Sequence, residues 1–155
     1  MTPSEAATLE AWVETLIPAD QDPGAKDANV VIYIDRQLTR KYKKLQTDYR
    51  QALTAMDRLA RRLRDVPFAQ LEPDDRTTLM VNLEAGKADK DIFSDGGKAV
   101  FEMVLAHAMQ GFYGNPRHGG NKDYVSWRMI GVPPMPVRGR QHYLVADTFP
   151  VPEKS

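Results

Sequence analysis

The chain has 155 residues, no cysteine, and 21 acidic against 21 basic residues, so its formal net charge is zero. This length suits a single folded domain, and 42% apolar with 27% charged residues is ordinary for a soluble globular chain. The lack of cysteine excludes disulfides, a cysteine nucleophile, thiolate-bound zinc and iron–sulfur clusters held by this chain. The apolar runs are too short to span a membrane, and the acidic N-terminus is unlike a signal peptide. Met1 is either native or an initiator added to a trimmed mature chain, so both cytoplasmic and exported forms stay open.

The first half of the chain predicts three helices. Thr2-Pro3-Ser4-Glu5 is a capping box, and it predicts a helix over residues 3–16 that stops before Pro18. A loop dense in turn formers follows at 19–24. The next helix has its inner face at Ala28, Val31, Ile34 and Leu38. The clearest amphipathic pattern comes last, at Tyr42, Leu45, Tyr49, Leu53, Met56, Leu59 and Leu63.

The second half predicts three more helices and one unusual loop. Glu72-Pro73 begins a helix that Gly86 ends, and Asp95 can cap the next one. Residues 114–123 contain three glycines and no periodicity, which indicates a loop of specific shape, before a short helix that ends at Gly131. The central core helix should carry the apolar stripe Val100, Phe101, Val104, Leu105, Ala108, Met109 and Phe112.

These patterns predict an all-α fold, an irregular bundle of five or six helices in a domain over residues 1–132. A proline-rich arm should follow at 133–155, either disordered or extended over another surface. Within the arm, only residues 141–146 could form a short extended stretch.

Charge is segregated along the chain, and this leaves several interpretations open. Residues 1–35 hold seven acids and one lysine, whereas residues 40–65 hold nine basic and three acidic residues. A solvated helix face opposite acidic neighbours is the preferred interpretation, because acidic flanks in a compact domain cancel much of the basic field. The alternatives are a basic helical module that binds nucleic acid and a surface that steers an acidic electron acceptor. Nucleic-acid binding would depend on Arg58, Arg61 and Arg62.

Candidate catalytic and metal residues are few. Asp20, Asp22 and Asp27 could offer oxygens to calcium, but they lack the spacing of an EF-hand, and a capped turn is the preferred interpretation. His118 and Asp123 could act as a general base and its orienting carboxylate in a small helical enzyme. A polar loop with mutual hydrogen bonds explains the same residues without chemistry. No histidine pair has zinc-ligand spacing, and no phosphate-binding glycine loop or nucleophile elbow is present, so we expect no metal or cofactor in this chain.

Three segments carry a resemblance to a known family. They are Leu16-Ile17-Pro18-Ala19-Asp20 with Pro23-Gly24-Ala25, then residues 31–38, and then Gly111-Phe112-Tyr113-Gly114-Asn115-Pro116-Arg117-His118-Gly119-Gly120-Asn121 with Trp127 and Ile130-Gly131. Over about residues 5–136 the chain resembles the small subunit (subunit 3, or gamma) of gluconate 2-dehydrogenase and related flavin-dependent sugar dehydrogenases.

The resemblance implies a non-catalytic, chaperone-like small subunit that pairs with a large dehydrogenase of the glucose–methanol–choline (GMC) type. The partner would hold FAD and the catalytic histidine, and would oxidise a sugar, a glycoside or a sugar acid such as gluconate. A cytochrome subunit with haem often takes the electrons in this family. The small subunit can also carry a twin-arginine export signal, which is missing here. The complex would then be periplasmic if this is a trimmed mature chain, and cytoplasmic otherwise.

We expect the loop at 114–128 and the arm at 133–152 to contact the flavoprotein, since aromatic and arginine side chains supply most of the energy at interfaces. Tyr113 and Trp127 could instead be core residues, and Arg117 and Arg128 could pair with partner carboxylates or with Asp123. The expected interface residues are Tyr113, Asn115, Arg117, His118, Asn121, Trp127, Arg128, Pro134, Met135, Tyr143 and Phe149.

Overall fold

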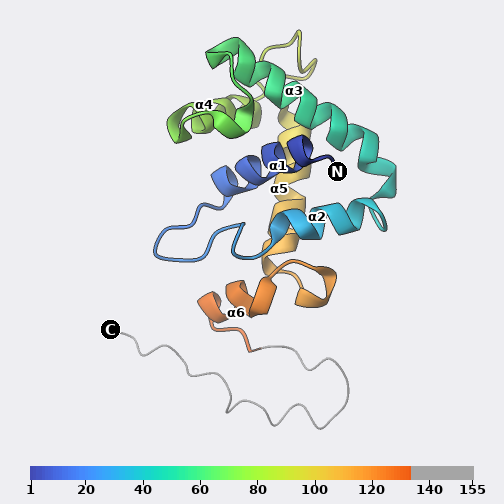
Figure 1. Ribbon diagram of the computed structural model, residues 1–155, viewed down its shortest axis with the longest axis vertical. Helices are drawn as coiled ribbons and strands as arrows, with labels where there is room; N and C mark the ends of the chain where they lie inside the picture. The colour runs from blue at the N-terminus through green and yellow to red at the C-terminus, as the bar shows by residue number, and fades with distance from the viewer. Residues whose placement is uncertain (134–155) are drawn as a thin grey trace.

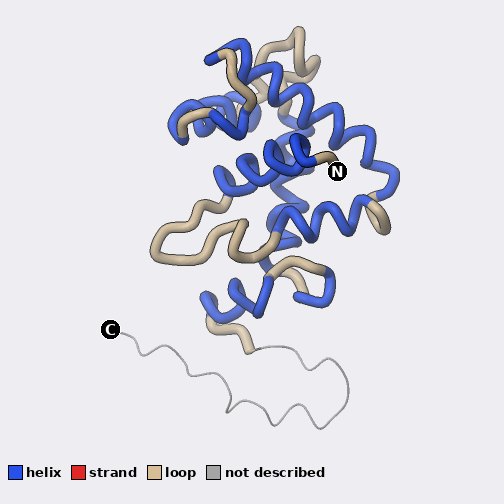
Figure 2. The backbone as a smooth tube through the Cα atoms, viewed as in Figure 1, coloured by secondary structure: helices blue, strands red, loops and turns tan. Residues whose placement is uncertain are grey.

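The computed structural model describes residues 1–133, and this part of the chain is all-α, as the sequence predicts. Figure 1 shows the arrangement, and Figure 2 shows helices and loops without any strand in the described part. The arm from residue 134 and the expected stretch at 141–146 lie outside the described residues. The helices are α1 (Pro3–Leu16), α2 (Val30–Leu38), α3 (Gln46–Arg64), α4 (Pro73–Glu84), α5 (Lys98–Tyr113) and α6 (Val125–Ile130), with short 3₁₀ helices at Lys43–Leu45, Phe68–Gln70, Pro116–His118 and Lys122–Tyr124.

Helix α5 lies along the long axis of the molecule, and it packs against α1, α2, α4 and α6 (Figure 1). The short α6 sits at the C-terminal end of α5, beyond the other helices. Within residues 1–133, no helix combines the length and the apolar composition that crossing a bilayer requires.

Local sequence signals place several helix ends correctly. The Thr2 hydroxyl accepts from the Glu5 backbone N–H at 3.2 Å, and the Glu5 carboxylate accepts from the Thr2 N–H at 2.8 Å, so the capping box is confirmed. Gly86 has φ +66° just after α4. The Asp95 carboxylate accepts from the N–H groups of Gly97 and Ala99 at 2.9 and 3.1 Å, which caps α5 as predicted.

The structure differs from the predicted pattern in the middle of the chain. The helix expected from Tyr42 begins only at Gln46, because the N–H groups of Arg40 and Tyr42 both bond to the Gln37 carbonyl and turn the chain first. Val31 is only partly buried, since α2 buries Val30, Tyr33 and Ile34 instead.

Two residues expected in the core are exposed. Leu63 and Met109 are 40% and 41% exposed, because no described element covers their faces of α3 and α5. The core proper is built from large side chains of every longer helix and of the 3₁₀ helix at Phe68–Gln70. Its largest fully buried members are Trp12, Tyr49, Phe68, Phe112, Leu9, Ile34, Leu53, Met56, Leu83, Val13, Val30 and Val104.

Asp57 joins three elements through one carboxylate oxygen. Its Oδ1 accepts from the Thr8 hydroxyl of α1 at 3.0 Å and from the Phe68 backbone N–H at 3.0 Å. Phe68 in turn places its ring 6.4 Å from that of Trp12. Asp57 therefore fixes the entry of an aromatic anchor into the core between α1 and α3.

We expect Asp57→Ala to lower the free energy of unfolding by about 2 kcal/mol, because it removes a charged acceptor from two partly buried donors. Asp57→Asn, which keeps an acceptor oxygen, should cost less. Urea unfolding measures both. The exposed Gln51→Ala on the same helix is the control, and an equal effect of all three substitutions would contradict the role given to Asp57.

A second polar network ties α5 to α2 and α3. The hydroxyls of Tyr33 and Tyr42 both donate to Oε1 of Gln110, the former at 3.2 Å. The Tyr49 hydroxyl lies 2.7 Å from Nδ1 of the buried His107, whose ring stacks on Tyr42 at 4.0 Å between centroids. Burial, with a smaller contribution from the charge of Lys41, lowers the pKa of His107. Burial also raises the pKa of Tyr49, so its hydroxyl stays protonated beside the imidazole.

This network predicts a pH dependence of stability. Because the pKa of His107 in the folded chain lies below its value of 6.5 in the unfolded chain, the unfolded state binds more protons between the two values. The stabilisation is therefore complete above pH 6.5 and is lost as the pH falls through the folded pKa. Urea unfolding at stepped pH from neutral to mildly acidic should show a steeper loss in the wild type than in His107→Gln. Parallel curves would contradict the assignment.

Candidate functional site

The loop that the sequence singles out connects α5 to α6 at one end of the bundle (Figure 1). Asn121 holds it from within. This side chain is fully buried, its Nδ2 donates to the Gly114 carbonyl at 2.9 Å, and its Oδ1 accepts from the Ser126 N–H at 3.0 Å. The two bonds join the start of the loop to the first turn of α6. Asn121 adopts φ +44°, a left-handed conformation that asparagine tolerates better than most residues.

Two glycines in the loop are required by close approach. A Cβ on Gly120 would overlap the backbone carbonyl of Gly111 in α5, so only glycine lets the loop lie directly on that helix. Gly119 has φ +105°, and a Cβ there would come within 2.9 Å of Cδ of Arg36. The loop is thus packed against α5 on one side and against the Arg36 side chain of α2 on the other.

The structure separates the two aromatic residues of the expected interface. Trp127 is 8% exposed and its indole N–H donates to the Tyr113 carbonyl at 2.7 Å. Trp127 is therefore a core residue, the second of the two alternatives. Tyr113 is 38% exposed at the end of α5, with its ring edge-on to Phe112 at 4.9 Å. Asn121 and Trp127 therefore hold the loop in shape, whereas Tyr113 is available at the surface.

Arg117 and His118 are exposed on the 3₁₀ helix at Pro116–His118, which Asn115 caps through its side-chain oxygen at 3.1 Å from the Arg117 N–H. Nε2 of His118 accepts from Nε of Arg117 at 3.1 Å. The ring partner of His118 is thus a cation and not the carboxylate of Asp123 that the enzyme alternative requires. The arginine contact occupies Nε2, the ring nitrogen that a general base would use, so this pair does not favour general-base chemistry.

Asp123 and Arg128 line a different feature, an open pocket of about 360 Å³ between the loop at 20–27 and α6. Lys122 also lines this pocket, and its backbone N–H donates to the Ala28 carbonyl at 3.3 Å. Its remaining lining is Asp22, Pro23, Asp27, Lys122, Val125 and Met129.

The acidic loop at 20–27 has the contacts of a capped turn. Asp20 accepts from the Asp22 N–H, and Asp27 accepts from the Gly24 N–H, both at 2.8 Å. Within residues 1–133, no group of three or more histidine, aspartate or glutamate side chains is placed to hold a metal ion.

The basic helix is partly neutralised by the chain itself. Arg64 forms a bidentate pair with Asp75 at 2.6 and 3.0 Å, and this pairing lowers the pKa of the Asp75 carboxyl. Arg62 pairs with Asp89, and Arg50 lies 3.9 Å from Glu5. The preferred interpretation, a solvated face with acidic neighbours, describes this part of the basic segment.

Sequence reasoning missed an apolar group around the loop. Met109 was expected in the apolar stripe of the core helix, yet it is 41% exposed. Ile130 at the end of the last helix and Val132 after it are 51% and 40% exposed. Met109 has the spacing of the apolar face of α5, but whether that part of the face is covered depends on how the other helices pack. Pro134, Met135, Tyr143 and Phe149 lie outside the described residues.

The role of Asn121 can be tested with the two tryptophans as internal probes. We expect Asn121→Ala and Asn121→Asp to speed hydrogen exchange of the Trp127 indole N–H by about tenfold, because each removes the donor to Gly114 that closes the loop. The Trp12 indole should keep its rate, as should both indoles in Lys122→Ala. NMR of the indole protons provides the measurement, and a parallel change at both tryptophans would show a global effect instead.

Comparisons with known proteins add one match. Residues 3–134 match the family described as gluconate 2-dehydrogenase subunit 3. The searches of curated proteins and of solved structures gave no significant match. Because the match spans most of the chain and contains all six helices, the chain belongs to the gluconate 2-dehydrogenase subunit 3 family.

Proposed function

We propose that this chain is a non-catalytic accessory subunit that binds and stabilises a large FAD-dependent dehydrogenase of the GMC type. The observation that carries the proposal is the family match over residues 3–134, whose description names a subunit of gluconate 2-dehydrogenase. The substrate of the complex is a sugar, a glycoside or a sugar acid such as gluconate. FAD belongs to the large subunit, and a cytochrome subunit with haem takes the electrons.

The contacts of the loop support a binding role for it. Its buried members, Asn121 and Trp127, are used for internal hydrogen bonds, and His118 is paired with a cation. What the loop presents outward is a fixed backbone with arginine and aromatic side chains, which are the groups that contribute most at protein interfaces.

The proposed contact surface is the loop end, defined here as Met109, Tyr113, Asn115, Arg117, His118, Ile130 and Val132. It combines four exposed large apolar side chains with a polar rim, an arrangement typical of interface cores and their edges. Arg128 belongs to α6, and the arm at 133–155 follows that helix in the sequence. We propose that the arm lies on the same partner.

The cellular location of the complex depends on whether this chain is exported. We propose a periplasmic complex if the chain is the trimmed form of an exported protein, and a cytoplasmic complex otherwise.

Co-expression of the tagged chain with a candidate large subunit of the GMC type tests the proposal. A yellow protein should co-purify and show dye-linked oxidation of a sugar or sugar acid. The double substitution Tyr113→Ser with Ile130→Ser should lower the recovered flavin by about tenfold, because it removes apolar anchors from the loop end.

The matched control is Leu63→Ser with Val81→Ser, which removes exposed apolar side chains from α3 and α4. This pair should leave the recovered flavin unchanged. A colourless chain without a co-purified flavoprotein would contradict the proposed function, and equal losses from both pairs would contradict the proposed contact surface.

A further inference from the structure

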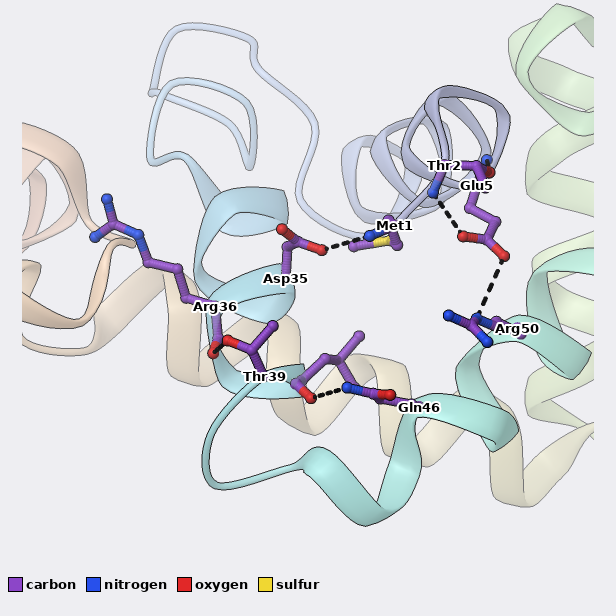
Figure 3. A network of polar contacts seen from close by, with 9 residues as sticks. Met1, Thr2, Glu5, Asp35, Arg36, Thr39, Gln46 and Arg50 are labelled. Carbon is purple, nitrogen blue, oxygen red and sulfur yellow. Dashed lines mark hydrogen bonds and ion pairs between the residues drawn. The ribbon is translucent and has the colours of Figure 1, made fainter.

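A group of five basic residues gathers where α2 leads into α3. We call it the basic turn: Arg36, Arg40, Lys41, Lys43 and Lys44, all of which are exposed. Figure 3 shows one of them, Arg36, whose side chain points away from α2.

Among residues 1–133 the basic turn forms no internal ion pair, whereas three arginines of α3 do. Further along α3, Arg50, Arg62 and Arg64 pair with Glu5, Asp89 and Asp75. None of the five side chains of the basic turn forms an ion pair with a residue in the range 1–133; the ammonium of Lys41 lies 5.6 Å over the Tyr42 ring.

The acid closest in sequence is also engaged elsewhere. Asp35 binds the N-terminal ammonium of Met1 at 3.0 Å, as Figure 3 shows. Asp48, in the first turn of α3, is the acid that follows the basic turn along the chain. The result is a local excess of positive charge on a molecule whose formal net charge is zero.

The backbone beneath these charges is held in place. The Gln37 carbonyl accepts from the N–H groups of Arg40 and Tyr42 at 3.0 and 2.7 Å. The Gln46 side chain donates to the Leu38 carbonyl at 2.7 Å, and the Thr39 hydroxyl donates to the Arg36 carbonyl at 2.9 Å (Figure 3). Together with the buried Tyr42 ring stacked on His107, these contacts fix the backbone from which the basic side chains extend.

We propose that the basic turn is a docking surface for a protein whose contacting face is rich in carboxylates. Five like charges held together without internal partners repel one another, and an acidic face relieves that repulsion while steering the encounter. Because the backbone that carries these side chains is already held in place, binding costs less backbone conformational entropy.

Two other kinds of partner fit the turn less well. A membrane surface would require apolar side chains to insert, but the apolar residues of the turn are buried (Leu38, Tyr42) or partly buried against the core (Leu45). A single-stranded nucleic acid would use exposed aromatic rings for stacking, and the aromatic ring of this turn lies under its own chain. A long polyanion would also meet the acids of α1 and Asp48, whereas a compact carboxylate patch need not.

This inference does not depend on the proposed function, since it concerns a different surface from the loop end. The test uses the full chain and a fluorescein-labelled oligoglutamate peptide, with binding followed by fluorescence anisotropy at low and physiological salt. The substitutions Arg40→Gln, Lys43→Gln and Lys44→Gln, made together, should weaken binding by about tenfold, and added salt should weaken the wild type similarly.

The matched control removes the same charge from the other end of α3, by Arg58→Gln, Arg62→Gln and Arg64→Gln together. It should change the affinity by less than about twofold, because two of these side chains are already paired with acids. The milder pair Lys43→Gln and Lys44→Gln should give an intermediate loss, and urea unfolding checks that each variant folds.

Three outcomes would overturn the inference. They are equal losses from the two triple variants, no measurable binding of the peptide by the wild type, and tighter binding of labelled DNA or phosphatidylserine vesicles than of the peptide.

Discussion

The close approach of the loop to α5 is the constraint on which the candidate site depends. Gly120 lies against the Gly111 carbonyl at a distance that no side chain allows, and Asn121 then closes the loop from inside with two hydrogen bonds. Trp127 completes the closure by bonding to the Tyr113 carbonyl. Because these inward contacts fix the backbone, the outward side chains start from fixed positions, which lowers the entropy lost on binding.

Charge and packing divide the surface into regions with different chemistry. One end of the bundle exposes apolar side chains around a fixed loop, whereas the turn between α2 and α3 exposes cations that have no ion-pair partner among residues 1–133. Arg36 links the two, since its side chain packs over Gly119. Three arginines of α3 are paired with acidic neighbours. A chain of zero net charge can therefore offer two distinct surfaces for binding.

Features that depend on neighbours in sequence were predictable. The capping box at Thr2, the Asp95 cap and the glycine after α4 are local, so the helix ends that they control follow from the sequence. The three glycines within 114–123 likewise predicted the loop between α5 and α6. Contacts across the fold were not predictable: nothing near Asp57 points to Thr8, nothing near Gln110 points to two tyrosines, and the exposure of Met109 follows only from the packing of other helices.

Hydrogen exchange of the chain alone and in its purified complex tests most directly whether this chain is a subunit that binds through the loop end. Mass spectrometry of peptides from both samples would locate the protected amides. The account predicts slower exchange at 111–128 in the complex and unchanged exchange in α4, at residues 73–84. Unchanged exchange throughout 111–128, or protection confined to α4, would contradict it.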